Sequence, residues 1–144
     1  MAGAPRPVAP MPSTETVHIV STAPKQARAT VRGFTFVSDK PVEKGGADEG
    51  PMPSEFFLVA LGTCMSMTFR RIAEARRVPV EGLDLTAEMD FSDQGDVTAL
   101  RLVARVKTPA ERKDVEKVFD IASRHCTVAK LVAEPPIQKV LEIV

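Results

Sequence analysis

Residues 53–77 read PSEFFLVALGTCMSMTFRRIAEARR and decide how the rest of the chain must fold. From Phe56 to Phe69 every residue is apolar or small, so a helix over this run has no polar face. Such a helix must be covered on every side by its own sheet, by another helix or by a partner chain. The run of about 14 residues is shorter than the ~20 needed to cross a bilayer. We therefore expect a core helix with Cys64 near its middle, and no membrane span.

The length and charge of the chain limit the classes of protein to which it can belong. A chain of 144 residues is about one domain, which we expect over residues 14–144. Its 19 basic and 19 acidic residues cancel, which argues against nucleic-acid and anionic-membrane partners. Residues 1–13 are rich in Pro and Ala, which predicts a disordered tail, and they lack the pattern of a signal peptide. We expect a cytoplasmic protein.

Runs of β-branched, aromatic or alternating apolar residues predict five strands. They cover residues 16–22, 28–38, 83–91, 100–107 and 137–144. The first two strands form a pair joined by a turn, and the third and fourth form a hairpin with one wet face. Acidic side chains on one strand of that hairpin can meet basic side chains on the other.

The second of these strands carries two arginines among its aromatic residues. If residues 28–38 form one continuous strand, the period of two places Arg28 and Arg32 on the same face as Phe34 and Phe36. Either guanidinium could then lie over an apolar pocket. The alternative is that both arginines are solvated on the outer face of an edge strand.

Two further helices are predicted after the hairpin. Residues 108–111 read Thr-Pro-Ala-Glu, a capping-box pattern with Pro at the first helical position. Apolar residues then recur at helical spacing as far as Cys126, which places this second cysteine on the buried side. A short helix follows over residues 127–134. The predicted order is ββαββααβ, an α+β fold with antiparallel sheet.

The two cysteines are the residues best suited to chemistry. A buried free cysteine is usually a small hydrophobic residue, but Cys64 and Cys126 both occupy core-facing helical positions, so their thiols could approach each other. The neighbouring His125 points about 100° away from Cys126 on a helix, so the two need not pair. The only histidines, His18 and His125, lack the paired spacing of a zinc site, and no Gly-rich phosphate loop is present. We expect no metal and no cofactor.

Several short motifs together resemble one family. Gly45-Gly46, residues 51–58 and Gly62-Thr63-Cys64, followed by His125-Cys126-Thr127-Val128, are similar to the OsmC/Ohr family of thiol-dependent hydroperoxide reductases. The resemblance is closest to the OsmC-like (YhfA-like) branch and covers nearly all of the chain from about residue 16. It implies an OsmC-like α+β fold with antiparallel sheets around a long central helix, in an intertwined homodimer.

The resemblance also implies a reaction. Cys64 would be the peroxidatic cysteine, which attacks an organic hydroperoxide and becomes a sulfenic acid. Cys126 would be the resolving cysteine, which condenses with that sulfenic acid to form a disulfide. A dithiol reductant, lipoyl-linked in relatives, would reopen the disulfide.

A thiol in the middle of a helix gains nothing from the positive N-terminal end, so it needs another group, a nearby cation, to lower its pKa. In the peroxidases of the family this group is an arginine held by a glutamate, and Arg28 and Arg32 are both candidates here. The glutamate directly follows the proline that corresponds to Pro53, but this chain has Ser54 there and Glu55 one residue later. Nine residues before Cys64, Glu55 lies about 180° from it around a regular helix.

Two functions remain open from the sequence. The first is a cysteine-based organic hydroperoxide peroxidase with an apolar pocket at its dimer interface. The second is a non-catalytic OsmC-like dimer that binds a small apolar ligand or senses redox state. The displaced glutamate favours the second function, and the two cysteines favour the first.

Overall fold

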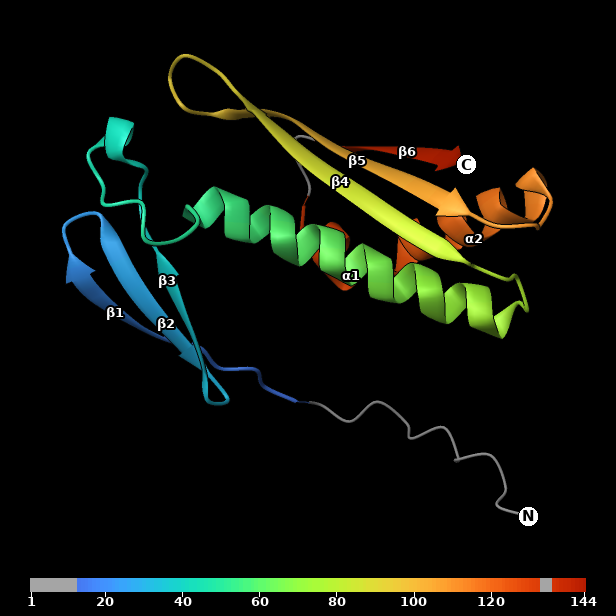
Figure 1. The fold of residues 1–144 in the computed structure, drawn as a ribbon, viewed down its shortest axis with the longest axis horizontal. Helices are drawn as coiled ribbons and strands as arrows, with labels where there is room; N and C mark the ends of the chain where they lie inside the picture. The colour runs from blue at the N-terminus through green and yellow to red at the C-terminus, as the bar shows by residue number, and fades with distance from the viewer. Residues whose placement is uncertain (1–12, 133–135) are drawn as a thin grey trace. The chain divides into compact units, whose positions relative to one another are not determined.

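The computed structural model describes residues 13–132 and 136–144. The chain divides into two compact units, residues 1–52 and residues 53–144 (Figure 1). The tail expected over residues 1–13 lies outside the described residues except for Ser13, and so do residues 133 and 134 of the third predicted helix.

Three strands form the sheet of the N-terminal unit, and they are antiparallel in the order β1-β2-β3. They are β1 (His18–Ala23), β2 (Gln26–Val31) and β3 (Phe34–Ser38). A continuous strand over residues 28–38 was the wrong prediction, because a two-residue turn at Arg32 and Gly33 divides it. Both turn residues have positive φ, 46° and 86°, as a tight hairpin turn between twisted strands requires.

A buried carboxylate organises the loop that follows β3 and contains the short 3₁₀ helix η1 (Val42–Lys44). Asp39 is 2% exposed and accepts hydrogen bonds from the backbone N–H of Lys40 at 2.7 Å and of Glu49 at 3.2 Å. The side chain of Gln26 and the N–H of Ala47 also donate to it. Burial raises the pKa of Asp39, but these hydrogen bonds outweigh it and hold the pKa below its usual value. The carboxylate thus ties the loop to β2.

The C-terminal unit contains a second three-stranded sheet with helices packed against it (Figure 1). Its elements are α1 (Pro53–Ala75), β4 (Gly82–Phe91), β5 (Val97–Lys107), α2 (Arg112–His125), α3 (Thr127–Lys130) and β6 (Ile137–Ile143). β4 and β5 form the predicted antiparallel hairpin, but β6 runs parallel to β5. The expectation of a wholly antiparallel sheet was wrong, because α2 and α3 form a crossover that returns the chain in the direction of β5.

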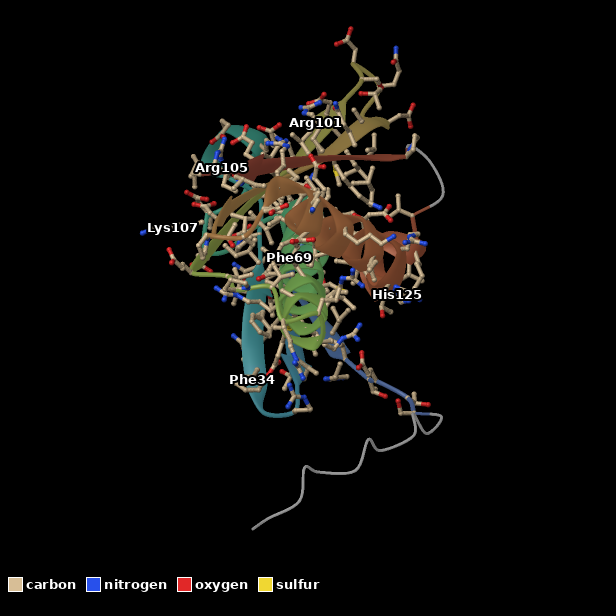
Figure 2. The ribbon with its side chains drawn as sticks, turned by 90° about the vertical axis from the view of Figure 1, so that its right-hand side faces the viewer. Phe34, Phe69, Arg101, Arg105, Lys107 and His125 are labelled. Atoms are coloured by element: carbon tan, nitrogen blue, oxygen red, sulfur yellow. The ribbon has the colours of Figure 1, made fainter. Side chains whose placement is uncertain are left out.

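The core of this unit lies between its sheet and its helices. Its fully buried side chains come from α1, β5, α2 and the residue that follows α2, and they include Leu61, Met65, Phe69, Leu102, Val106, Val115, Val118, Ala122 and Cys126. Figure 2 shows Phe69 on α1 beneath the strands, whereas Arg101 and Arg105 of β5 lie on the other side of the sheet. The period-two and helical patterns of the sequence therefore predicted the buried faces of β5 and α2 correctly.

The outer face of the hairpin carries the cross-strand charge pairs expected from the sequence. Arg101 forms ion pairs with Glu88 at 2.9 Å and with Asp90 at 2.6 Å. Two nitrogens of its guanidinium donate to the two oxygens of Asp90. The prediction that acids of one strand meet bases of the other is confirmed.

Helix α2 begins later than its capping-box pattern predicted. Its first residue is Arg112, and its N-cap is Glu111 rather than Thr108. The Thr108 hydroxyl donates to the carbonyl of Pro79 at 2.6 Å and accepts from the N–H of Ala110 at 3.0 Å. These two bonds hold residues 108–110 as a turn, so the helix starts only after it.

Helix α1 is long and apolar enough to span a membrane, a test that the core helix of a soluble protein also passes. One side of α1 packs on β4, α2 and α3, where Leu61 and Met65 are fully buried. On other sides of the helix Val59 is 55% exposed and Met67 is 72% exposed. The C-terminal unit therefore leaves part of α1 uncovered.

Candidate active site

Cys64 lies at the edge of the buried side of α1. The helix is regular from Pro53 to Ala75, so Cys64 is near its middle, and its side chain is half-buried against the core cluster. A thiol in this position is in contact with the core and still accessible from outside it.

Cys126 lies where the chain passes from α2 to α3. Its backbone is extended, with φ −67° and ψ 111°, and its N–H still donates to the carbonyl of Ala122 at 2.9 Å. It therefore ends α2 and precedes Thr127, the first residue of α3. The side chain is fully buried and belongs to the same core cluster as Cys64. The chain turns at the cysteine itself, so the backbone that follows it begins a new helix beside α1.

The two thiols are neighbours in the core cluster, and each shifts the pKa of the other. Burial raises the pKa of Cys64 more than any other single influence. Hydrogen bonds from the N–H of Val128, the thiol of Cys126, the N–H of Thr127 and the side chain of Thr68 together outweigh burial, so the pKa of Cys64 is below its usual value. Cys64 therefore gains stability as the thiolate.

Cys126 responds in the opposite direction. Burial raises the pKa of its thiol, and the neighbouring Cys64 raises it further through a hydrogen bond and through charge repulsion. Two adjacent thiols cannot both ionise easily, so the proton stays on the more buried sulfur. Cys126 is thus the hydrogen-bond donor of the pair, and Cys64 is the sulfur that can attack an electrophile.

The backbone donors at the start of α3 were missed in the sequence. Cys64 lies far from both ends of its own helix, which is why a nearby cation was predicted to lower its pKa. The first N–H groups of a helix have no partner within that helix, and in α3 the N–H groups of Thr127 and Val128 lower the pKa of Cys64. The signal available was the boundary between the two helices, which the sequence placed at Cys126.

Arg28 and Arg32 both lie in the N-terminal unit, and the prediction that they share a face with the phenylalanines was wrong for Arg28. In the register of the sheet Arg28 is opposite Val37, while Ala29 is opposite Phe36, so Arg28 is on the other face from Phe36. Arg32 is in the hairpin turn, where its guanidinium carbon lies 5.4 Å from the centroid of the Phe34 ring. The turn removes Arg32 from the alternation of the strand.

Glu55 is in the first turn of α1 and is exposed. Because the helix is regular between Glu55 and Cys64, nine residues of about 100° each place their side chains on opposite sides of it. Ser54, which occupies the position of the family's glutamate, is half-buried and about 80° from Cys64.

An apolar groove of about 360 Å³ lies between α1 and β4. Its lining residues are Leu58, Val59, Gly62, Thr63, Ser66, Leu83, Leu85 and Ala87. Gly62 and Ser66 lie about 160° from Cys64 around the helix, so the groove opens on the opposite side of α1. The thiol pair and the groove are therefore separate features.

Metal ligands do not cluster in the described residues 13–132 and 136–144, where no group of three or more His, Cys, Asp or Glu side chains could hold an ion. The imidazole of His125 is exposed at the end of α2 (Figure 2), with its Nδ1 3.0 Å from the carbonyl of Ile121. The histidine beside Cys126 in sequence is therefore held against its own helix.

One family model matches the chain, that of the OsmC-like proteins, over residues 45–140. This match contains α1, both cysteines and most of the C-terminal unit. No curated protein matches the chain at a significant level.

Solved structures resemble the chain over nearly its whole length. A crystal structure of an OsmC-like protein from Mycoplasma pneumoniae is 16% identical and has a TM-score of 0.80, covering 93% of this chain and 98% of its own. An OsmC-like protein of unknown function from Vibrio cholerae is 17% identical, with a TM-score of 0.71 and coverages of 92% and 99%. The organic hydroperoxide resistance protein OhrB of Bacillus subtilis is 15% identical, with a TM-score of 0.67 and coverages of 92% and 98%. At these identities the similarity shows the fold alone.

Proposed function

Because the chain belongs to the OsmC-like protein family, we propose that it reduces organic hydroperoxides through a two-cysteine cycle of Cys64 and Cys126. The family includes proteins named for organic hydroperoxide resistance and others of unknown function. The observation that supports the enzyme is the pair of neighbouring thiols in the core, in which the pKa of Cys64 is lowered and the pKa of Cys126 is raised. The sulfur of Cys64 can attack the hydroperoxide, and the sulfur of Cys126 lies beside it and can form the disulfide.

The cycle has three steps, and each conserves atoms and electrons. The Cys64 thiolate attacks the distal peroxide oxygen, the O–O bond breaks, and the alkoxide takes a proton and leaves as an alcohol. The sulfur of Cys126 then attacks the sulfenic acid sulfur of Cys64, a disulfide forms, and water leaves. A dithiol of the lipoyl type reduces this disulfide by exchange and is itself oxidised to a disulfide.

A thiol titration tests this function. Reduced protein is treated with cumene hydroperoxide, and free thiols are counted after denaturation. We expect both cysteines of each chain to be lost together, cumyl alcohol to appear in equal amount to the protein, and a dithiol to restore both thiols. Retention of both thiols, with the hydroperoxide unconsumed, would exclude the enzyme.

Self-association is part of the proposal. Besides Val59 and Met67 on α1, the N-terminal sheet exposes Ile19 at 65% and Phe34 at 56%. Exposed apolar side chains on both units are typical of a surface that a partner covers. We expect an intertwined homodimer in which the α1 helices pack together.

Replacing Met67 by Asp is expected to dissociate this dimer, because the interface would have to bury an unpaired carboxylate. Association should weaken by at least about a hundredfold, measured by sedimentation equilibrium. The matched control is Leu131→Asp, which introduces the same charge at a residue that is 79% exposed and lies outside α1. A wild-type chain that sediments as a folded monomer at micromolar concentration would contradict the dimer.

An arginine of the N-terminal unit is expected to add to the activation of Cys64, with Glu55 of the partner subunit holding it. The residue types match those of the family's peroxidases, although Glu55 is displaced by one position. We expect either Arg28→Gln or Arg32→Gln, but not both, to raise the pKa of Cys64 by about one unit. Alkylation rates measured against pH decide between them, and an unchanged pKa in both variants would remove arginine from the site.

A second function is supported by the apolar groove between α1 and β4. Its volume of about 360 Å³ and its lining of aliphatic and small residues suit a small apolar ligand, and it opens away from Cys64. In that case the protein would be a binding or sensing dimer. It would retain both thiols in the titration and bind an apolar fluorescent probe, which Ala87→Phe should displace.

OsmC-like proteins are generally soluble, and the packing of α1 on the sheet of its own unit agrees with this. We propose that the protein acts in the cytoplasm, where dithiol reductants keep cysteines reduced. The balanced charge of the chain gives no support to a nucleic-acid or membrane partner.

A further inference from the structure

Thr68 is a polar residue in the buried part of α1. It is 9% exposed and lies in the same stretch of helix as Met65, Phe69 and Ile72, which belong to the core. A hydroxyl group in such a position lowers the stability of the protein unless it has a hydrogen-bond partner. Thr68 therefore needs a partner within reach of its short side chain.

Cys64 is in the right position to be that partner. It precedes Thr68 by four residues, so the two side chains lie on the same side of the helix, one turn apart. The side chain of Thr68 is close enough to the Cys64 sulfur to lower the pKa of its thiol. Thr63, also on α1, behaves differently, because its hydroxyl donates to the carbonyl of Val59 at 2.7 Å, the usual bond of a helical threonine.

We propose that Thr68 is a further residue of the Cys64 site and that its hydroxyl donates a hydrogen bond that stabilises the attacking thiolate. A hydroxyl can donate to a thiolate or accept from a thiol, and the bond to the charged sulfur is the stronger. Only the role of Thr68 in catalysis rests on the proposed function. The hydrogen bond and its effect on ionisation can be measured without any peroxide.

Within the C-terminal unit, the thiolate is then stabilised by uncharged donors. They are the N–H groups of Thr127 and Val128, the thiol of Cys126 and the hydroxyl of Thr68. The charged side chains of the elements that pack around Cys64 are exposed, and they are Asp84, Glu88 and Asp90 of β4, Arg112, Lys113, Asp114, Glu116, Lys117, Asp120, Arg124 and His125 of α2, and Lys130 of α3. Exposed charges are screened by water and salt, so the hydroxyl should contribute visibly.

The test is the pH dependence of alkylation of Cys64 by iodoacetamide in wild type, Thr68→Val, Thr68→Ser and Thr63→Val. Trypsin separates the two cysteines, since cleavage after Lys44 and Arg70 releases Cys64 and cleavage after Arg124 and Lys130 releases Cys126. Valine keeps the shape of threonine without its hydroxyl, and serine keeps the hydroxyl. Mass spectrometry of the two peptides then gives the rate at each thiol.

Thr68→Val is expected to raise the midpoint of the Cys64 profile by about 0.5 to 1 pH unit, which slows alkylation at neutral pH by about threefold to tenfold. The rates should converge at high pH, where the thiol is ionised in both proteins. Thr68→Ser should restore the wild-type midpoint, and Thr63→Val should leave it unchanged.

An unchanged midpoint in folded Thr68→Val would overturn the inference, and so would equal shifts in Thr68→Val and Thr68→Ser, which would mean that packing alone is responsible. A different result would refute the proposed function. If the midpoint shifts as expected while wild type leaves cumene hydroperoxide unconsumed, Thr68 tunes the thiol and the peroxidase cycle is wrong.

Discussion

Replacing Cys64 by serine is expected to abolish hydroperoxide reduction, lowering the rate of cumene hydroperoxide consumption by about a thousandfold or more. The reaction needs an anionic sulfur, and the four donors around Cys64 lower the pKa of its thiol, a group that ionises far more readily than a hydroxyl. A serine hydroxyl in the same place remains protonated, because the same hydrogen bonds cannot make up for its far weaker acidity. The substitution changes one atom and leaves the half-buried site otherwise intact.

The measurement is the rate of hydroperoxide loss with a dithiol present, compared between wild type and Cys64→Ser. The far-UV circular dichroism spectrum shows whether the variant is folded, and a denatured thiol count should find only Cys126. Thr63→Val serves as the control from the same helix, since Thr63 bonds the carbonyl of Val59. If Cys64→Ser consumed hydroperoxide at the wild-type rate, the nucleophile would have to be another residue, and the cycle would be refuted.

The parts of the fold that depend on side-chain pattern could be predicted from the sequence. The apolar run around Cys64 predicted α1, and helical spacing predicted that Cys126 is buried at the end of α2. Alternation predicted the β4–β5 hairpin and its outer charge pairs. Each of these features depends on which side chains are buried, and the sequence of a single helix or strand shows this.

The features that were predicted wrongly or missed are those that backbone geometry determines. The turn at Arg32 and Gly33 depends on two positive φ angles, and the aromatic residues after Gly33 continued the strand pattern, so the division into β2 and β3 was missed. The direction of β6 depends on the crossover through α2 and α3 and not on its own residues. The N–H donors of Thr127 and Val128 belong to the backbone, so they cannot be recognised from the residue types.

The same distinction applies to the candidate site. Residue types identified Cys64 and Cys126, because a thiol is recognisable wherever it lies. They could not rank the two thiols, since this ranking depends on which sulfur is more buried and which receives hydrogen bonds. The order of the proposed chemistry, with Cys64 attacking and Cys126 resolving, is therefore supported by the structure in a way that the spacing of the cysteines could not provide.

Replacing Cys126 by serine is expected to stop the cycle after its first step. The serine hydroxyl can still donate a hydrogen bond to the Cys64 sulfur, so the first equivalent of cumene hydroperoxide should be consumed at a rate within about threefold of wild type. No thiol is then available to condense with the sulfenic acid, and Cys64 should remain as the sulfenic acid or be oxidised further when hydroperoxide is in excess. Wild type should instead form the disulfide and recover with a dithiol.

Trapping with dimedone distinguishes these outcomes, because it labels a sulfenic acid and leaves a disulfide unlabelled. We expect about one label per chain on Cys64 in Cys126→Ser and almost none in wild type after one equivalent of hydroperoxide. Cys126→Ala lacks both the thiol and the donor, so it should give the same label more slowly than Cys126→Ser. Equal first-step rates in the two variants would mean that Cys126 does not assist ionisation of Cys64, and repeated turnover by either variant, without sulfenic acid, would remove Cys126 from the cycle.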